Sequence, residues 1–336
     1  MRYFALLLLV ATGPIACGAE TARPIFFSNS DRISPARCAA IAELDARGSI
    51  VNDVVTIDSS TILVLYGSER ELVTYDDKFR ALSTVSFERD GPRGVGAAVS
   101  ATKDGNVLYV ADEERMLIKL FDLAGQDRGT IRLDFVPRRV RSAGGTIVVS
   151  PLVMAGHPTS LLYSLRDGRP RSLALPIARY EDAGINAFAN MGSIAGFPDG
   201  RIVVMHEMIV PFGYSISPSD SASSTNRFAV PLPESQRSRI GKLPEPPLTD
   251  KNIGDMVAVA LTATPDPVTG HTYFLTRTGR KVGGSWEKMI VELDTAMGFV
   301  RAGVVLNRRP LHMTYLPNRR ALLVVDDADR WLECTL

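Results

Sequence analysis

A unit of four short strands recurs along this chain, and its recurrence constrains the fold more than any other feature. Residues 95–133 show the unit most clearly, because four alternating apolar and polar runs are separated there by turn residues such as Asp104-Gly105. The second strand of the unit is found six times, at intervals of about 40 to 70 residues. The six copies are Ile62–Leu65, Val107–Val110, Ile147–Val149, Ile202–Val204, Thr272–Leu275 and Leu322–Val325. The pattern predicts an all-β, six-bladed β-propeller.

The segment DGNVLYVAD at residues 104–112, together with its neighbours, resembles the six-bladed propellers of the NHL and TolB-like group. The resemblance covers about residues 37–336 and implies one ring-shaped domain. Two stacked β-sandwich domains are the alternative. Sandwiches are disfavoured because they would not repeat a four-strand unit at this interval.

The last blade lacks a strand, and the N-terminal end of the ring can supply it. The chain after Leu311 has room for only three strands, whereas the segment Arg37–Leu44 precedes blade one without a partner. Antiparallel pairing of Arg37–Leu44 with Trp331–Leu336 closes the ring and leaves no sheet edge at the seam. This pairing places Cys38 near Cys334, and in an exported chain it predicts a disulfide. A pair of buried free thiols is the alternative.

The N-terminus has the features of an export signal. Arg2 precedes the mostly apolar run Tyr3–Ala11, which is too short to span a bilayer. Cys17 follows small residues and resembles the lipobox of bacterial lipoproteins, which implies lipidation at Cys17. Cleavage near Ala19 by ordinary signal peptidase is the alternative. We therefore assign residues 1–19 to a signal peptide and 20–36 to a tether, and expect a protein of the bacterial periplasm or outer membrane whose lipid is its only membrane contact.

Charge and composition limit the classes of partner that this chain can bind. Lys and Arg number 38 against 37 Asp and Glu, so the net charge of +1 excludes the strong field of a duplex-binding protein, and no nucleic acid is expected. Residues 215–250 contain eight Ser and six Pro around one strand-like run, Arg227–Leu232. This composition predicts an insertion in blade four, either a lid over one face or a disordered excursion.

Propeller ligands usually bind where loops from several blades converge at the central channel. We take the face formed by the loops between second and third strands, together with the connections between blades, as the ligand face. Basic and aromatic candidates on that face are Arg93, Arg138, Arg139, Arg308, Arg309 and Trp286. Clustered guanidinium groups favour an anionic ligand. The alternative is that these arginines pair with acids on the same face, namely Asp112, Glu113, Glu114, Asp326 and Asp327.

Three histidines, His157, His206 and His312, are weaker candidates for a divalent metal at the channel, because each falls in a different blade. No cofactor is predicted from a motif, since the sequence contains no HExxH, Walker loop or nucleophile elbow.

Two classes of function follow. The first is a monomeric, exported and membrane-anchored propeller that acts as a binding scaffold at the cell envelope, with an envelope protein, an anionic small molecule or a glycan as its partner. The alternative is a metal-dependent hydrolase or lyase with its site in the central channel.

Overall fold

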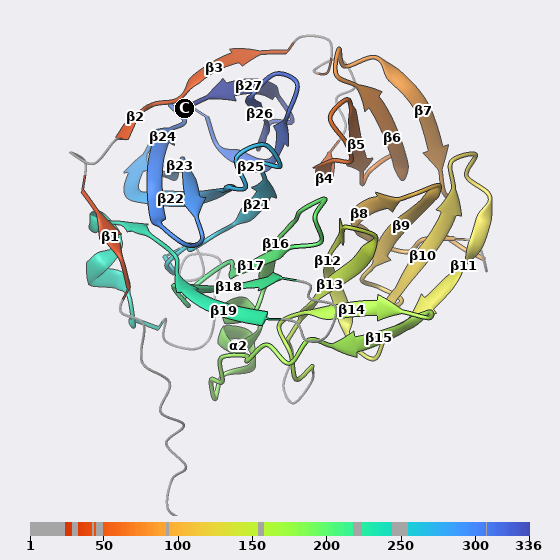
Figure 1. The fold of residues 1–336 in the computed structure, drawn as a ribbon, viewed down its shortest axis with the longest axis horizontal. Coiled ribbons are helices and arrows are strands. Elements are labelled where there is room, and N and C mark those ends of the chain that lie inside the picture. The colour runs from red at the N-terminus through yellow and green to blue at the C-terminus, as the bar shows by residue number, and fades with distance from the viewer. Residues whose placement is uncertain are drawn as a thin grey trace, which may run out of the picture.

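The computed structural model describes residues 24–28, 33–41, 44, 50–91, 94–153, 158–217, 224–243, 255–306 and 308–336. Within these residues the chain forms a six-bladed propeller (Figure 1). Blade one is β4 (Val51–Thr56), β5 (Thr61–Tyr66), β6 (Glu71–Asp76) and β7 (Ala81–Ser86). Blade two is β8 (Ala98–Asp104), β9 (Val107–Asp112), β10 (Leu117–Asp122) and β11 (Asp127–Arg132). Blade three is β12 (Val136–Ala143), β13 (Thr146–Leu152), β14 (Tyr163–Arg166) and β15 (Arg169–Ser172).

The second half of the ring repeats the arrangement. Blade four is β16 (Gly192–Gly196), β17 (Ile202–His206), β18 (Phe212–Ser217) and β19 (Ser224–Ala229). Blade five is β21 (Thr262–Pro265), β22 (Thr272–Val282), β23 (Ser285–Asp294) and β24 (Gly298–Val304). Blade six is β25 (Pro310–Leu316), β26 (Ala321–Asp326), β27 (Trp331–Thr335) and β3 (Arg37–Ala40). Each second strand predicted from the sequence lies within the second strand of its blade.

The first strand of each blade lines the central channel. The strands β4, β8, β12, β16, β21 and β25 contact one another in that order, and β25 contacts β4 to complete the ring. The channel therefore has two mouths. We call the face with the loops between second and third strands the upper face, and the face with the turns between first and second strands the lower face.

The hydrophobic core lies between the blades. Val54, Val64 and Val73 of blade one, for example, pack against Leu323 and Val325 of blade six. Because each sheet is covered on both faces, the central strands are apolar at nearly every position, and β26 is buried throughout. Because they are buried on both faces, the second strands are continuously apolar, and they are therefore the part of the repeat that is easiest to recognise in the sequence.

Carboxylates at the ends of third strands hold the outer turns. Asp76 accepts hydrogen bonds from the backbone N–H groups of Lys78 and Arg80, and Asp122 accepts them from Ala124 and Gln126. These bonds lower the pKa of both carboxyl groups. The pairs Tyr75-Asp76 and Phe121-Asp122 are thus turn signals, in which the aspartate fixes the reversal into the fourth strand.

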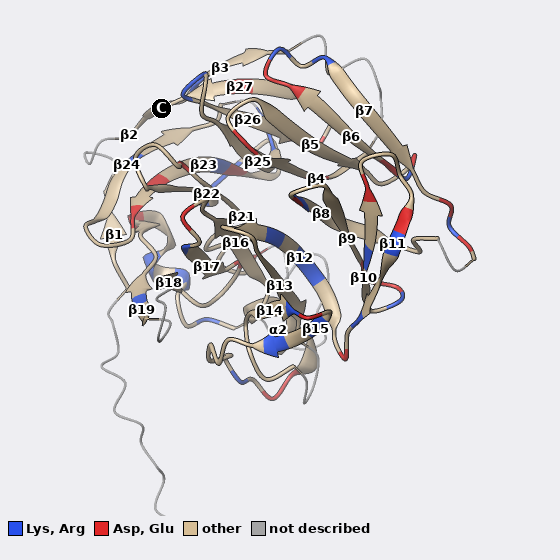
Figure 2. Cartoon of the chain, turned by 45° about the vertical axis from the view of Figure 1, so that its right-hand side comes forward, with Lys and Arg blue, Asp and Glu red and all other residues tan. Residues whose placement is uncertain are grey.

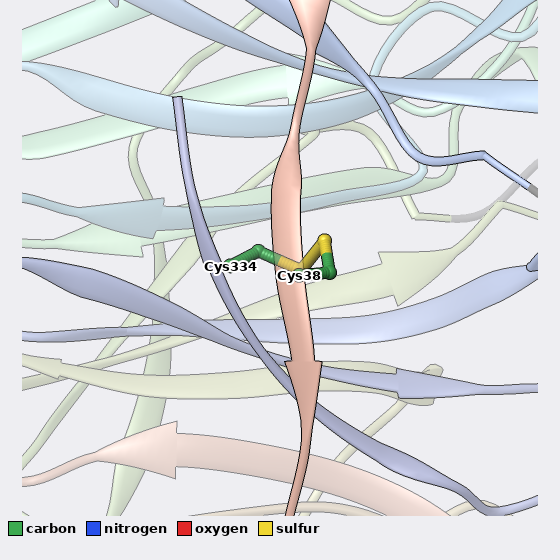
Figure 3. The surroundings of a disulfide bond; sticks show 2 residues. All are labelled: Cys38 and Cys334. Atoms are coloured by element: carbon green, nitrogen blue, oxygen red, sulfur yellow. A yellow bond between two sulfur atoms is a disulfide. The ribbon is translucent and has the colours of Figure 1, made fainter.

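The seam closes as predicted. β3 pairs antiparallel with β27, and Cys38 stands opposite Cys334 in the register. The two residues form a disulfide with their Cα atoms 4.1 Å apart (Figure 3). The N-terminal strand therefore completes blade six and bonds covalently to the last strand of the chain.

The segment before the seam is more ordered than a free tether. β1 (Phe26–Phe27) pairs in parallel with β20 (Leu232–Pro233), and β2 (Ile33–Pro35) pairs in parallel with β24 as a fifth strand on blade five. Phe27 is buried and stacks on Phe299, with ring centroids 4.3 Å apart. Part of residues 20–36 thus packs on the outside of the propeller, whereas residues 1–23, with the signal segment and Cys17, lie outside the described residues.

Helical structure is short in the described part of the chain. α2 (Ala183–Ala189) lies in the connection into blade four, capped by the Asp182 carboxylate, which accepts a hydrogen bond from the Ile185 amide. The 3₁₀ helix η1 (Glu234–Arg239) follows β20 inside the Ser/Pro-rich region. That region contributes the outer strand β19, which begins earlier than the predicted run at Arg227. No helix in the described ranges is long and apolar enough to cross a membrane.

Removal of the disulfide is expected to destabilise the propeller. For the double variant Cys38→Ala/Cys334→Ala, the free energy of unfolding in urea should fall by about 2–4 kcal/mol, because the bond closes a loop across nearly the whole chain. A reductant should lower the stability of the unaltered protein by a similar amount and leave the double variant unchanged. Equal stability with and without reductant would show that the seam is held by strand pairing alone.

Candidate functional site

Two adjoining pockets open on the upper face beside blades five and six. Their volumes are about 420 and 510 Å³, and they share the residues Ser285, Trp286, Arg309 and Asp327. We call the first the upper pocket. Its lining residues are Asp255, Arg277, Lys281, Gly284, Ser285, Trp286, Lys288, Leu311, Arg309 and Asp327. The hairpin between β22 and β23 supplies most of them, because these two strands extend beyond the other strands of blade five.

The upper pocket has more cations than anions. Of the described residues that line it, four are basic and two are acidic. The acidic residues each have a basic partner: Asp255 lies 2.9 Å from the Lys281 ammonium, and Asp327 lies 3.3 Å from the Arg309 guanidinium. The carboxylates of the pocket are therefore already engaged, and a positive charge remains at Lys288.

Lys288 carries part of that remaining charge. Its ammonium group donates to the Pro310 carbonyl oxygen at 2.5 Å, and no carboxylate among the described residues forms an ion pair with it. Burial and, after it, the charge of Arg277 lower the pKa of Lys288 to about 8. The pKa of Arg277 is itself lowered to about 10, chiefly by burial and then by Arg239. An anion bound here would stabilise the charged form of both groups.

Trp286 is held in place by cations on the same hairpin and on η1. The guanidinium carbon of Arg239 lies 4.1 Å from the centroid of the Trp286 ring, and the Lys281 nitrogen lies 4.6 Å from it. Both distances are typical of cation–π contacts. Trp286 therefore forms a wall of the pocket and also joins η1 to blade five.

Arg139 crosses the upper half of the channel. It starts from β12, and its guanidinium group lies 3.5 Å from Glu207, 3.7 Å from Asp53 and 3.3 Å from the Leu261 carbonyl oxygen. Its partners thus come from three other sectors of the ring. Blue bands in Figure 2 mark the basic residues of β12 beside the channel.

Below Arg139, Asp53 and Arg141 form a buried ion pair. The Asp53 oxygens lie 2.7 and 2.8 Å from the two terminal nitrogens of Arg141, and Ser100 donates to the same carboxylate at 2.5 Å. Burial alone would raise the pKa of Asp53, but Arg141 and Arg139 outweigh it and lower the pKa to about 2. This network joins blades one, two and three across the channel.

His312 and Arg138 lie at the upper end of the same network. Burial lowers the pKa of His312 to about 4, and the charges of Arg139, Lys288 and Arg138 act on it while Asp53 opposes them. Within the described residues, His312 Nδ1 and Arg138 Nε are buried without a hydrogen-bond partner. Buried polar atoms usually have partners, so these two mark a place where a ligand or water can bind.

The other predicted residues are placed as follows. Arg308 lies 4.0 Å from Asp326 and Arg309 lies 3.3 Å from Asp327, so both approach acids on their own face. The acid Asp112 instead accepts hydrogen bonds from the amides of Gly96 and Ala97. Arg93, His157 and Cys17 lie outside the described residues.

The histidines do not assemble into a metal centre in the described structure. His206 is buried at the end of β17, where Nδ1 lies 2.7 Å from the Ala189 carbonyl oxygen, and burial lowers its pKa to about 4. No group of three or more His, Cys, Asp or Glu side chains among the described residues is placed to hold a metal ion. His206 and His312 therefore occupy separate environments.

Sequence reasoning missed Asp53, Arg141, Glu207 and Lys288. Asp53 and Glu207 are charged residues within or directly after mostly apolar strands, as in the runs VNDVVT and IVVMHE, whereas Arg141 and Lys288 lie in strands that contain other charged residues. A charge in a mostly apolar strand must be paired or face a polar cavity, which is the signal that would have identified Asp53 and Glu207.

Comparison with known proteins supports the fold. No family model matches this sequence, and no curated protein matches it at a significant level. A member of the DUF4221 family from Bacteroides vulgatus has a TM-score of 0.64 at 10% identity, over 90% of this chain and 98% of that chain. A gluconolactonase from Xanthomonas campestris has a TM-score of 0.52 at 13% identity, over 90% and 91%. A catalytically inactive virginiamycin B lyase from Staphylococcus aureus has a TM-score of 0.51 at 11% identity, over 90% and 99%. At these identities the likeness concerns the propeller fold alone.

Proposed function

We propose that this protein is an exported propeller that binds an anionic ligand at its upper pocket. The observation that carries the proposal is the excess of positive charge in that pocket, where Lys288 has no carboxylate partner among the described residues. A carboxylate, phosphate or sulfate group would accept hydrogen bonds from Lys288 and Arg277, and Trp286 supplies an aromatic surface beside them. The ligand class is an anionic small molecule or an acidic glycan.

The cellular setting is part of the same proposal. The Cys38–Cys334 disulfide is the kind of bond that persists in an oxidising compartment, which favours export. We propose that the chain is held at the outer membrane by a lipid on Cys17 and presents the propeller as a monomeric binding scaffold. Labelling of the expressed protein with a radioactive fatty acid, with Cys17→Ser as the control, tests the anchor.

Removal of the Lys288 charge is expected to weaken anion binding about tenfold. A charged hydrogen bond contributes about 1.5–3 kcal/mol, and 1.4 kcal/mol corresponds to a tenfold change. The measurement is the affinity of Lys288→Met for heparin and for inorganic phosphate by calorimetry. Affinity of the unaltered protein should also fall as the pH rises through about 8, because Lys288 loses its proton there.

Arg166→Met is the matched control, since Arg166 is exposed at the end of β14, away from the pocket. This variant should bind like the unaltered protein. If Lys288→Met binds both anions as well as the unaltered protein does, or if Arg166→Met loses as much affinity, the upper pocket is not the anion site.

A further inference from the structure

A further pocket lies at the opposite end of the channel from the upper pocket. It has a volume of about 540 Å³ and opens on the lower face, and we call it the lower cup. Every blade contributes to it through its first strand and the turn that follows. Its lining residues include Val55 and Ile57 of blade one, Lys103 of blade two, Ser142 of blade three, Phe197 of blade four, Pro265 and Val268 of blade five, and Met313 of blade six.

The inner end of the lower cup adjoins the ion network of the channel. Of the charged residues that line the cup in the described structure, Arg141 alone is buried. Its guanidinium group donates to Asp53, to the Ser100 hydroxyl at 3.0 Å and to the Val140 carbonyl oxygen at 2.8 Å. Above this pair, Arg139 crosses the channel. The ion network of Asp53, Arg141 and Arg139 therefore lies between the cup and the upper mouth of the channel.

The charged side chains of the cup have hydrogen-bonding or charged neighbours. The Asp104 carboxylate accepts a hydrogen bond from the Ser142 hydroxyl at 3.2 Å. Asp58 accepts one from the Ser60 amide at 2.9 Å, and the charge of Lys103 helps to lower its pKa. Arg141 is neutralised by Asp53. The remaining charged residues of the lining are Asp58 and Asp104 against Lys103, so the cup, unlike the upper pocket, has no excess of positive charge to select an anionic ligand.

Apolar side chains form most of the wall. Val268 is 65% exposed at the rim although it is a large aliphatic residue, and Val55 and Ile57 remain only partly buried. Water in such a cavity gains few hydrogen bonds, whereas an apolar group would bury this surface and gain free energy in proportion to the area covered. The volume lies within the range of small-molecule sites, about 300–1,000 Å³.

We propose that the lower cup binds an uncharged small molecule with an apolar ring or chain. The apolar part lies inside against Val55, Phe197 and Met313, and the polar end lies at the rim beside Lys103 and the hydroxyl of Ser59. This site is independent of the upper pocket and of the anionic ligand proposed for it.

The test uses the neutral fluorescent probe N-phenyl-1-naphthylamine with the purified mature protein. The unaltered protein should bind the probe saturably with one site per chain. Val55→Trp and Ser142→Phe, on different blades, each place a large side chain in the cup and should weaken binding at least tenfold. Circular dichroism and thermal melting verify that each variant is folded. Because there are two variants, the test can still be made if one of them does not fold.

Two controls separate the lower cup from other surfaces. Met297→Trp adds the same ring at a position that is 84% exposed and does not line the cup, and it should leave probe binding unchanged. Lys288→Met alters the upper pocket only and should also leave it unchanged. Absence of saturable binding by the unaltered protein, or equal binding by folded Val55→Trp and Ser142→Phe, would overturn the proposal. Failure of the heparin experiment would leave this result intact.

Discussion

Deletion of residues 21–46 is expected to abolish folding of the propeller. The deletion removes β3, and with it the strand that covers β27 and the residue that bonds Cys334. It also removes Ile41 and Leu44, which are 6% and 3% exposed between blades one and six. Two such aliphatic side chains contribute about 2–5 kcal/mol each, and the disulfide about 2–4 kcal/mol. Their sum is comparable with the whole stability of a domain, about 5–15 kcal/mol.

The shorter deletion of residues 21–36 is the matched control. It removes β1 and β2 but keeps β3, so the ring remains closed. The control should remain monomeric and unfold cooperatively, with a lower melting temperature because Phe27 no longer packs against blade five. Size-exclusion chromatography and thermal melting distinguish the two products. A monomeric 21–46 deletion with an unchanged melting temperature would show that closure by β3 is not required.

Replacement of Asp53 by Asn is expected to cost about 3–5 kcal/mol of unfolding free energy. The substitution removes the carboxylate that both Arg141 and Arg139 approach, and it leaves two buried guanidinium groups with less compensation. Urea unfolding measures the loss. The double variant Asp53→Leu/Arg141→Met removes both charges together and should recover most of the stability, because an apolar pair can replace a buried ion pair of similar volume.

The lowered pKa of Asp53 also predicts how the stability of the protein changes in acid. The folded-state pKa of Asp53 is about 2, below its ordinary value of 3.8, so the unfolded chain takes up the proton first as pH falls. The stability from this group is complete above pH about 4 and is lost between about 4 and 2, on the order of 2 kcal/mol.

Other aspartates, including Asp76 and Asp122, also have lowered pKa values. The unaltered protein and the Asp53→Asn variant should therefore both lose stability in acid. The loss between pH 4 and 2 should be smaller in Asp53→Asn than in the unaltered protein. Identical pH profiles for the two proteins would contradict the assigned role of Asp53.

Local patterns were sufficient for the blades and for the seam. Period-two alternation, buried central strands and turn-forming aspartates depend on residues within one blade, and these interactions repeat wherever the sequence repeats. The register of the seam could be predicted because one leftover strand and one incomplete blade have a single pairing that closes the ring. Both inferences required only the order of segments along the chain.

Local patterns could not predict which side chains and which pockets lie at each end of the channel. From the sequence, the arginines of β12 are expected on the ligand face, but in the structure Arg139 contacts Glu207 and Asp53 inside the channel. The lower cup opens on the lower face, where turns from all six blades meet.

The sequence by itself determined the blades, their order and the closing disulfide. Only the tertiary structure decided which charges meet in the channel and which are left facing a cavity. Asp53 and Arg141 are 88 residues apart. Their contact depends on how far the ring turns between blades one and three, and on which side chains its radius brings within reach. The distance between the two residues is set by the packing of every blade against its neighbours, so no local sequence pattern encodes it.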